Sequence, residues 1–379
     1  MARVVHIIKI KRIAGAERHL LLLVDGQRQH GVDAQIVMLV NPGQPMADML
    51  AEAEARGIPI QRLVIHGRAD LSLFWRLRAV LRDLRPEVVH THLQHADLFG
   101  IPAARLAGVP VVVSSRHNDD PRRRWLWLRL LNRALWALAD GGIGISQAVT
   151  RFTIAVEGVS PAKMRTIHYG VELQPPLERA PARAALRREL GLPDGALLAG
   201  IVCRLSPEKG VPYALAAFDQ VADRFPAVHL VIVGDGDQRG DLEAQSQALA
   251  VGERVHFLGW RTDIPQVMAA LDVLLMPSLR EGFGLAMLEA MAQQVAIIGS
   301  AASAIPEVVA DGETGLLVSP RDPDALAGAL ARLLEDAPLR QHMGLLGRDR
   351  LETRFSAERM VAETLTLYAD LLARRPGSG

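Results

Sequence analysis

Short apolar runs alternate with longer amphipathic stretches along most of the chain. The apolar runs predict strands at 4–10, 32–40, 58–65, 87–92, 109–115, 141–146, 196–203, 228–234, 254–259, 271–278 and 295–300. The stretches between them show helical periodicity, and further helical segments close the chain at 323–335, 338–351 and 356–374. Strands that alternate with helices favour parallel sheets covered by helices on both faces. The pattern therefore predicts an α/β protein.

The alternation weakens in a segment rich in proline and charge, which predicts a linker region at 173–195. We expect two facing, Rossmann-like, doubly wound domains at 1–172 and 196–355. The last segment, 356–379, predicts a C-terminal helix that packs back on the N-terminal domain. Parallel sheets bind ligands at the carboxyl ends of their strands. The interdomain cleft is therefore the expected ligand site.

The composition supports a folded protein of two domains. The chain has 379 residues, of which 49% are hydrophobic. Its apolar runs are too short for a membrane span, and the N-terminal run lacks the cleavage site of a signal peptide. The single cysteine, Cys203, excludes an intramolecular disulfide and a cysteine-based metal cage, and it fits a reducing compartment. We expect a cytoplasmic protein.

The formal net charge of +1 hides an asymmetry between the two halves. Residues 1–170 carry 23 basic and 14 acidic side chains, whereas the rest of the chain carries 20 and 28. A basic half suits phosphates, nucleic acid or an anionic membrane as a partner.

Two cations follow the first predicted strand of the second half. Arg204 and Lys209 lie in a loop that ends at Gly210. A guanidinium fork and an ammonium both suit a phosphate, and the helix after Gly210 adds the positive end of its dipole. On their own, the two side chains are better explained as solvated loop charges.

Two acids flank a glycine-containing turn after the strand predicted at 271–278. Glu281 precedes Gly282 and Gly284, which let the backbone approach a ligand closely, and Glu289 lies inside the following apolar helix. Carboxylates accept hydrogen bonds from sugar and ribose hydroxyls. A helix dipole explains an acid at Glu281 but not one at Glu289, so ligand binding is the favoured interpretation.

Histidines gather near two predicted strand ends of the N-terminal half. His90, His92 and His95 fall in and after one strand, and His117 follows the next strand along the chain. Clustered histidines are candidate metal ligands, but no nearby carboxylate completes a metal-binding pattern. We expect core or surface positions for His90 and His95 and no metal site.

A glycine-rich turn at 234–240 has a glycine spacing that misses the dinucleotide-binding fingerprint. Asp235 and Asp237 in this turn fit either a D-x-D metal site or the cap of the next helix.

These motifs follow one another in a specific order: R-L-x-x-x-K-G at 204–210, G-D-G at 234–236, F-L-G at 257–259, E-x7-E at 281–289 and IPEVVADGETGLLV at 305–318. Together they resemble the C-terminal nucleotide-sugar domain of retaining GT-B glycosyltransferases of glycosyltransferase family 4. The N-terminal half is similar in its Gly-Ala-Glu turn, in VVHTHLQ and in YGVE at 169–172. The resemblance extends from about residue 4 to the last helix and implies an acceptor-side domain at 1–172 and a nucleotide-sugar-binding domain at 196–355.

The resemblance also implies roles for individual residues. Arg204 and Lys209 would hold the donor diphosphate, Glu281 would face the transferred sugar, and His117 would lie near the anomeric centre. These four are the predicted catalytic residues. Glu289 would bind the ribose, and the predicted donor-binding set further includes Gly15, Gly234, Leu258, Gly259, Phe283, Gly284 and Leu285.

The sequence departs from the family pattern at two positions. Ala14 and Cys203 stand where the family usually has glycine. Both side chains are small, so we expect the donor site to survive.

The resemblance implies a retaining hexosyltransferase that works in bacterial cell-surface polysaccharide or glycolipid assembly. Its donor would be a UDP- or GDP-linked sugar, and its acceptor a hydroxyl group, free or lipid-linked. The fixed cations would replace a divalent metal, so no metal, cofactor or nucleic acid is expected. Two alternatives stay open: a GT-B sugar-nucleotide epimerase or phosphorylase, and a non-catalytic protein that binds a nucleotide sugar.

The segment 122–140 predicts one amphipathic helix. At 100° per residue, Trp127 falls on the face expected to pack on the sheet and Arg129 on the opposite side, which Trp125 and Trp136 flank. Arginine beside tryptophan is typical of an interfacial helix, so an anionic membrane on its cytoplasmic face is a candidate partner. The other interpretation is a surface helix whose tryptophans pack on neighbouring loops.

Overall fold

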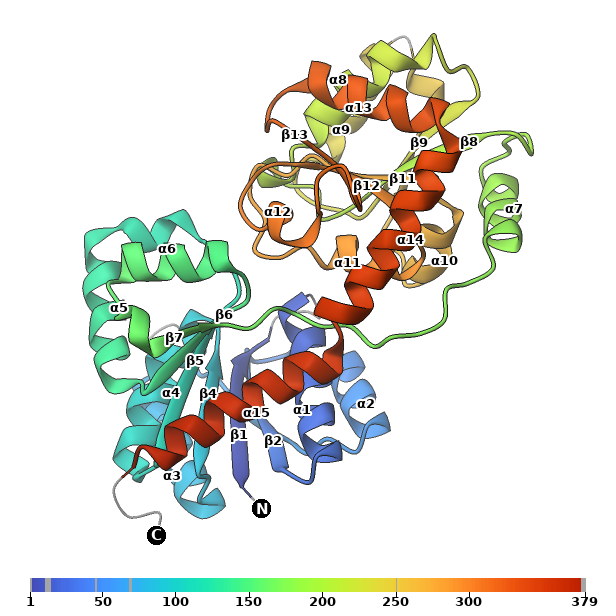
Figure 1. Ribbon diagram of the computed structural model, residues 1–379. Coiled ribbons are helices and arrows are strands. Elements are labelled where there is room, and N and C mark those ends of the chain that lie inside the picture. Colours follow the sequence, from blue (N-terminus) through green and yellow to red (C-terminus); the bar gives the residue numbers. More distant parts are fainter. Residues whose placement is uncertain (1, 11–14, 45, 68–69, 250, 376–379) are drawn as a thin grey trace. The chain divides into compact units, whose positions relative to one another are not determined.

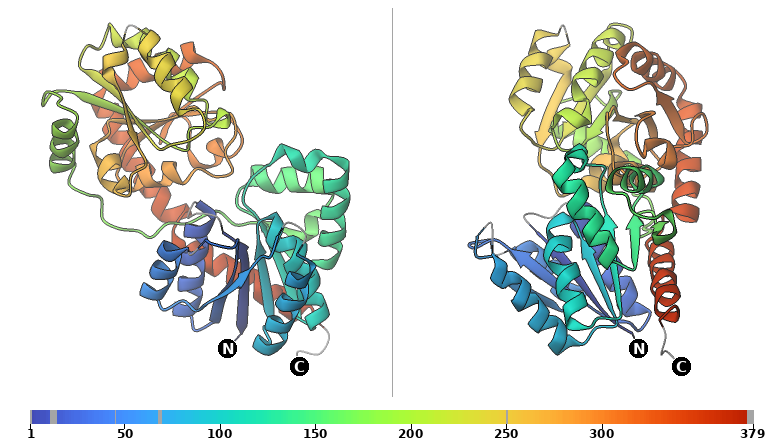
Figure 2. Two further views of the ribbon diagram at one scale, coloured as in Figure 1. Left: turned by 180° about the vertical axis from the view of Figure 1, so that it is seen from behind. Right: turned by 90° about the vertical axis from the view of Figure 1, so that its left-hand side faces the viewer.

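The computed structural model describes residues 2–10, 15–44, 46–67, 70–249 and 251–375. The chain divides into two compact units (Figures 1 and 2). Unit 1 comprises Met1–Glu172 and Ser356–Gly379, and unit 2 comprises Leu173–Phe355. Each unit contains a parallel sheet, which confirms the predicted α/β class with two Rossmann-like units.

Unit 1 has a seven-stranded sheet in the order β3-β2-β1-β4-β5-β6-β7. Its strands are β1 (Arg3–Lys9), β2 (Asp33–Val40), β3 (Ile60–Val64), β4 (Val88–His92), β5 (Val111–Arg116), β6 (Gly141–Gly144) and β7 (Met164–Thr166). Its helices are α1 (Gly15–Gln29), α2 (Ala47–Ala55), α3 (Leu71–Leu84), α4 (Gln94–Ala107), α5 (Leu126–Leu138), α6 (Gln147–Glu157) and α15 (Ala357–Ala373), with short 3-10 turns η1 (Pro121–Arg124) and η2 (Pro161–Lys163).

The two faces of the unit 1 sheet bury alternate side chains. In β1, Val4 and Ile8 pack in a core with α1, α2 and α15, whereas Val5 and Ile7 pack on the other face with α3, α4 and α5. This alternation is what a strand with helices on both faces requires. Helix α15 follows unit 2 in the sequence but lies beside the unit 1 sheet (Figure 1). Its apolar side chains, among them Tyr368, are buried in the unit 1 core.

Unit 2 has a six-stranded sheet in the order β10-β9-β8-β11-β12-β13. Its strands are β8 (Leu197–Val202), β9 (Val228–Val233), β10 (Val255–Gly259), β11 (Val273–Met276), β12 (Ala296–Ser300) and β13 (Gly315–Val318). Its helices are α7 (Arg179–Glu189), α8 (Val211–Ala222), α9 (Arg239–Ala248), α10 (Ile264–Ala270), α11 (Leu285–Ala292), α12 (Ile305–Val308), α13 (Pro323–Glu335) and α14 (Ala337–Arg354), with 3-10 turns η3 (Pro207–Lys209) and η4 (Gly252–Arg254).

The segment predicted as a linker contains helix α7, which belongs to unit 2. Strands β7 and β13, which are three and four residues long, were not among the predicted strands. None of the helices in the described parts of the chain has the length and apolar character that crossing a bilayer requires.

Candidate functional site

The predicted cations and acids of unit 2 lie in loops that leave neighbouring strands at the same edge of the sheet. Strand β8 leads into the loop of Arg204 and Lys209, and β11 leads into the turn of Glu281. The two strands pair in parallel, so their carboxyl ends are adjacent. Lys209 Nζ lies 2.5 Å from Glu281 Oε2, and only 16% and 11% of the two side chains are exposed. The structure therefore brings two of the predicted catalytic residues into one ion pair.

Arg204 is half exposed and pairs with Glu208 at 2.6 Å, not with Glu281. The backbone carbonyl of Glu208 accepts from Leu279 N at 2.8 Å, which ties the loop after β8 to the loop after β11. Although partial burial opposes it, hydrogen bonds that include one from Arg204 lower the pKa of Glu208. Glu208 was not among the predicted site residues, although its i, i+4 spacing from Arg204 indicates such a pair.

Two glycines hold backbone conformations that a side chain would disrupt. Gly234 has φ +124°, and a Cβ there would lie 1.8 Å from the carbonyl oxygen of Cys203. Its amide donates to Gly259 O at 2.8 Å, so the turn after β9 meets the end of β10. Gly284 has φ +91° and immediately precedes α11. Leu258 lies half-buried in β10 next to Gly259.

The predicted donor-binding residues in and before α11 differ in how deeply their side chains are buried. Phe283 is buried and lies edge-on to Phe355 with ring centroids 5.6 Å apart, so its side chain belongs to the core. A donor contact at Phe283 would therefore have to come from its backbone. Leu285 begins α11, and Glu289 is half-buried between buried Leu288 and Ala290.

The expectation that Asp235 or Asp237 caps the next helix is wrong. Helix α9 begins at Arg239, and its N-cap residue is Gln238, without a side-chain cap. Asp235 instead accepts from the amide of Gly236 at 2.7 Å within the turn.

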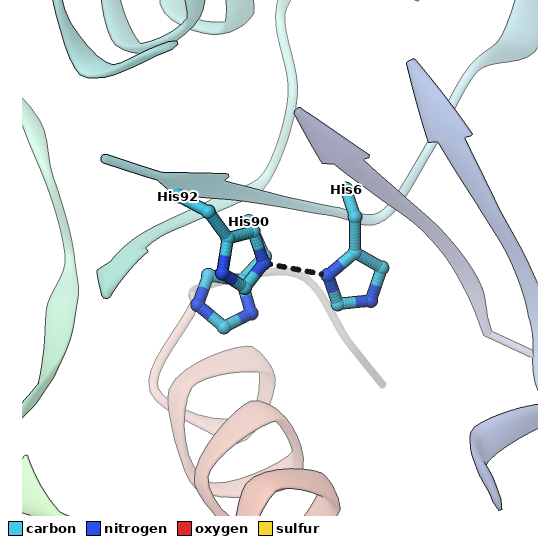
Figure 3. A group of neighbouring side chains, drawn as sticks. All are labelled: His6, His90 and His92. Atoms are coloured by element: carbon cyan, nitrogen blue, oxygen red, sulfur yellow. Dashed lines mark hydrogen bonds between the residues drawn. The ribbon is translucent and has the colours of Figure 1, made fainter. Parts of the chain in front are cut away.

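Unit 1 holds three buried histidines side by side (Figure 3). His6 of β1 pairs in register with His90 of β4, and His92 lies two residues further along β4. Their ligand atoms lie within 4.8 Å of one another. Within the described ranges they are the one group of three His, Cys, Asp or Glu side chains close enough to share a metal ion. The sequence analysis considered His90 and His92 but not His6.

Each ring nitrogen of these three histidines has a hydrogen-bond partner. His90 Nδ1 lies 2.6 Å from the hydroxyl of Tyr368, and His90 Nε2 lies 2.7 Å from Ser115 Oγ. His6 and His92 contact each other, at 3.0 Å between His6 Nδ1 and His92 Nε2 (Figure 3). A network of neutral imidazoles therefore satisfies the cluster without a metal ion.

A chain of hydrogen bonds connects His117, after β5, to this network. Its Nδ1 lies 2.5 Å from the hydroxyl of Tyr169, and its Nε2 lies 3.2 Å from His92 Nδ1. At the far end, His6 Nε2 lies 2.8 Å from the side-chain amide oxygen (Oε1) of Gln27. A neutral imidazole donates from one nitrogen and accepts at the other. With the Gln27 oxygen as final acceptor, each ring donates from Nε2 and accepts at Nδ1, and Tyr169 donates its phenolic proton.

Burial keeps the imidazoles of this chain neutral. It lowers the pKa of His6 to about 4 and that of His117 to about 3, and for His117 the Arg123 and Arg116 guanidiniums add to the effect. Burial, with a smaller contribution from Glu17, raises the pKa of Tyr169. His117 therefore serves as a neutral group at physiological pH, and both of its nitrogens are already engaged.

Further residues that the sequence analysis did not single out surround His117. His19 of α1 stacks on Tyr169 with centroids 4.2 Å apart and lies edge-on to His117 at 5.7 Å. Gly15, a predicted donor-binding residue, begins the same helix. Ala14, which stands where the family usually has glycine, lies outside the described residues.

The predicted orientation of the segment 122–140 is wrong in two respects. Trp127, expected to pack on the sheet, is 59% exposed, and Trp136, expected beside the surface arginines, is buried. The segment also forms two elements, η1 and α5, instead of one helix. The reason is a buried polar group: Trp136 Nε1 donates to Glu157 Oε2 at 2.7 Å, and Arg116 pairs with the same carboxylate at 2.8 Å. Satisfying that carboxylate turns Trp136 inward.

Two family models match the chain in succession. One, described as Glycosyltransferase Family 4, matches residues 13–175, and the other, Glycosyl transferases group 1, matches residues 182–350. The D-inositol 3-phosphate glycosyltransferase of Corynebacterium glutamicum is 33% identical over 75% of this chain and 70% of its own. The UDP-Gal:alpha-D-GlcNAc-diphosphoundecaprenol alpha-1,3-galactosyltransferase of Escherichia coli is 27% identical over 98% of both chains.

Solved structures agree on the fold. The Anabaena protein HepE, in complex with UDP and glucose, has a TM-score of 0.86 at 22% identity and covers 98% of this chain and 100% of its own. The two parallel-sheet units thus have the GT-B architecture of glycosyltransferases. The chain belongs to glycosyltransferase family 4.

Proposed function

We propose that this protein is a retaining hexosyltransferase that uses a UDP- or GDP-linked sugar and a hydroxyl acceptor. The observation that carries the proposal is the Lys209–Glu281 pair at the carboxyl edge of the unit 2 sheet. It sets a cation suited to the donor diphosphate beside a carboxylate suited to sugar hydroxyls. Arg204, on the same loop as Lys209, supplies a second cation.

The chemistry follows from where charge develops. As the bond from the anomeric carbon to the diphosphate breaks, negative charge grows on the leaving group and the sugar gains oxocarbenium character. Cations fixed beside the diphosphate stabilise the transition state more than the ground state. In the front-face step that we propose, the acceptor oxygen bonds to the anomeric carbon from the side of the leaving group, and a phosphate oxygen takes the acceptor proton.

The same cations support a reaction that needs no divalent metal. A metal in such an enzyme would neutralise the leaving diphosphate, and Lys209 and Arg204 carry the two positive charges for that task. We therefore propose that the enzyme has no metal or other cofactor.

The names of the relatives support the class of substrate. The Escherichia coli relative is named for a UDP-linked galactose donor and a diphosphoundecaprenol-linked acceptor, and HepE was solved with UDP and glucose. By analogy we propose a role in bacterial cell-surface polysaccharide or glycolipid assembly, with a lipid-linked acceptor.

A screen of nucleotide sugars tests the donor proposal, because a bound ligand raises the melting temperature by linkage. We expect one UDP- or GDP-sugar to stabilise the protein and its nucleoside diphosphate to be released in the presence of acceptor. Conversion of the donor without any acceptor would favour an epimerase or phosphorylase. Stabilisation without turnover of any donor, across a broad panel of acceptors, would favour a binding protein.

The surface of α5 supports a second part of the proposal, contact with an anionic membrane. Trp125, Leu126, Trp127 and Leu130 are each at least 55% exposed. Exposed arginines lie among them, at positions 122, 124, 129 and 133. Large exposed apolar side chains next to arginines suit the boundary between acyl chains and anionic headgroups. We propose that this face holds unit 1 on the cytoplasmic side of the membrane, where a lipid-linked acceptor would be found.

Flotation with vesicles tests the membrane proposal. We expect binding to anionic but not neutral vesicles, weakened by salt and by joint replacement of Trp125 and Trp127 with serine. Trp260→Ser is the matched control, because Trp260 is 65% exposed but lies in unit 2. Failure to float with anionic vesicles at low salt would contradict the proposal.

A further inference from the structure

Four arginines line a cavity of about 650 Å³ in unit 2. Arg179, Arg183 and Arg187 recur every four residues on one face of α7, and Arg340 of α14 lines the cavity with them. All these residues belong to unit 2.

The positive charge of this cavity exceeds the negative charge. Four guanidiniums line it, against the carboxylates of Asp272 and Asp194. Asp272 is buried, pairs with Arg183 and lies 3.8 Å from Arg340 Nη2. Burial lowers the pKa of Arg340, and the Arg183 charge adds to that effect. The four guanidiniums and two carboxylates thus leave an excess of two positive charges around a cavity that is partly open to solvent.

Hydrogen bonds to backbone carbonyls hold these guanidiniums in place and leave other N–H groups available to a ligand. Arg187 Nε donates to Ala196 O at 3.0 Å, and Arg179 Nη1 donates to Gln294 O at 3.3 Å. Such contacts use only part of the five N–H groups of each arginine. The Nε of Arg183 is buried and, among the described residues, has no hydrogen-bond partner.

The cavity lies at the opposite edge of the sheet from Lys209 and Glu281. Ala196, Asp272 and Gln294 each precede a strand, namely β8, β11 and β12. Lys209 and Glu281 follow β8 and β11. The length of the strands therefore separates the two places, and one bound donor cannot fill both.

We propose that this cavity is a second anion-binding site, which takes a small phosphorylated molecule carrying at least two negative charges. Arginine forks bind phosphate oxygens in pairs, and the volume is in the range of small-molecule sites. Because α7 supplies three of the arginines, the ligand would fasten this helix to the body of unit 2. The site is independent of the proposed transferase function.

Calorimetry with inorganic pyrophosphate tests the site, at constant ionic strength and in an Arg204→Ala/Lys209→Ala background that weakens the donor site. We expect one remaining binding event. Ala184→Glu, which places a carboxylate in the cavity without removing an arginine contact, should weaken it at least about tenfold. Ala185→Glu is the matched control, because Ala185 is also exposed on α7 but does not line this cavity.

Arg183→Gln gives a second test and should likewise weaken pyrophosphate binding at least about tenfold, with the melting temperature reporting whether the variant folds. Absence of the event in the double-variant background would overturn the proposal, as would equal binding by the Ala184→Glu and Ala185→Glu variants. Similar affinities for pyrophosphate, sulfate and chloride would mean an adventitious ion only, and would overturn it as well. Weaker binding of inorganic phosphate than of pyrophosphate would support a ligand with more than one phosphate group.

Discussion

Lys209 Nζ and Glu281 Oε2 lie 2.5 Å apart although 72 positions separate the two residues in the chain. The contact exists because β8 and β11 are parallel neighbours, so the loops after them leave the sheet side by side. A bound donor would meet a cation and a carboxylate that are already oriented, which lowers the cost of arranging them during the reaction.

Replacing the donor cations should reduce transfer strongly. We expect Lys209→Ala and Arg204→Ala each to lower kcat by about 10²–10³, because each removes a group that stabilises charge on the leaving diphosphate. The control is Arg224→Ala, an exposed arginine paired with Glu335 on the surface of unit 2. Circular dichroism checks the fold, and near-normal rates in the folded double variant would refute the assignment.

Replacing Glu281 and replacing Glu289 should have different effects on ligand binding. Glu289→Ala should weaken binding of the free nucleoside diphosphate, because its predicted partner is the ribose. Glu281→Ala should instead affect the intact nucleotide sugar and turnover more than the free diphosphate. Calorimetric titration with both ligands measures the difference. Equal losses of diphosphate affinity in the two variants would show that the division of roles is wrong.

Activity should persist in an excess of chelator. The proposed reaction places fixed cations, not a metal ion, at the leaving group, and hydrogen bonds already occupy the ring nitrogens of His6, His90 and His92. A rate assay before and after dialysis against EDTA measures this. Complete loss of activity that a divalent metal restores would contradict the prediction and direct attention to Asp235 and Asp237.

The buried histidines should make unit 1 sensitive to acid. The folded-state pKa values of His6 and His117, about 4 and about 3, lie below the ordinary value of 6.5. As pH falls below 6.5, the unfolded chain takes up protons that the folded chain excludes, so stability is lost until the folded pKa is reached. Over that interval, each histidine lowers the free energy of unfolding by about 1.4 kcal/mol for each pH unit of acidification.

Urea unfolding between pH 7 and pH 5 measures this loss. His117→Asn should reduce the pH dependence of the free energy of unfolding by the contribution of one histidine. The control Thr366→Ala, at an exposed position, should leave that pH dependence unchanged. A free energy of unfolding that is independent of pH in this range would contradict the protonation states assigned to the network.

Much of the fold was predictable because residues at the ends of its strands and helices indicate where these elements begin and end. Helix α3 illustrates this: Asp70 accepts from Leu73 N at its start, and the helix ends at Leu84, with Arg85 as its C-cap residue before Pro86. Helix α7 was missed because its arginines and flanking prolines have the composition of a linker. Its arginines are explained only by tertiary contacts, such as the pair between Arg183 and Asp272.

The candidate site was predictable where ligand chemistry leaves a motif. Arg204, Lys209 and Glu281 were selected by order and spacing, and the structure adds that two of them form a pair. His6 and His19 carry no such pattern, since their connection to His117 depends on strand pairing and on the packing of α1. Tyr169 lies in the YGVE motif, but the motif does not indicate its contact with His117. Trp136 was placed on the wrong face because helical periodicity does not report the buried Glu157 that it satisfies.

The central claim is that the protein transfers a sugar from a nucleotide donor with retention of configuration. The direct measurement is proton NMR of the product formed from the donor that stabilises the protein and a hydroxyl acceptor. The account predicts an acceptor-dependent product whose anomeric centre has the same configuration as the donor, formed by the wild type and lost in Lys209→Ala. A product of inverted configuration, or one formed equally well by the Lys209→Ala variant, would contradict it.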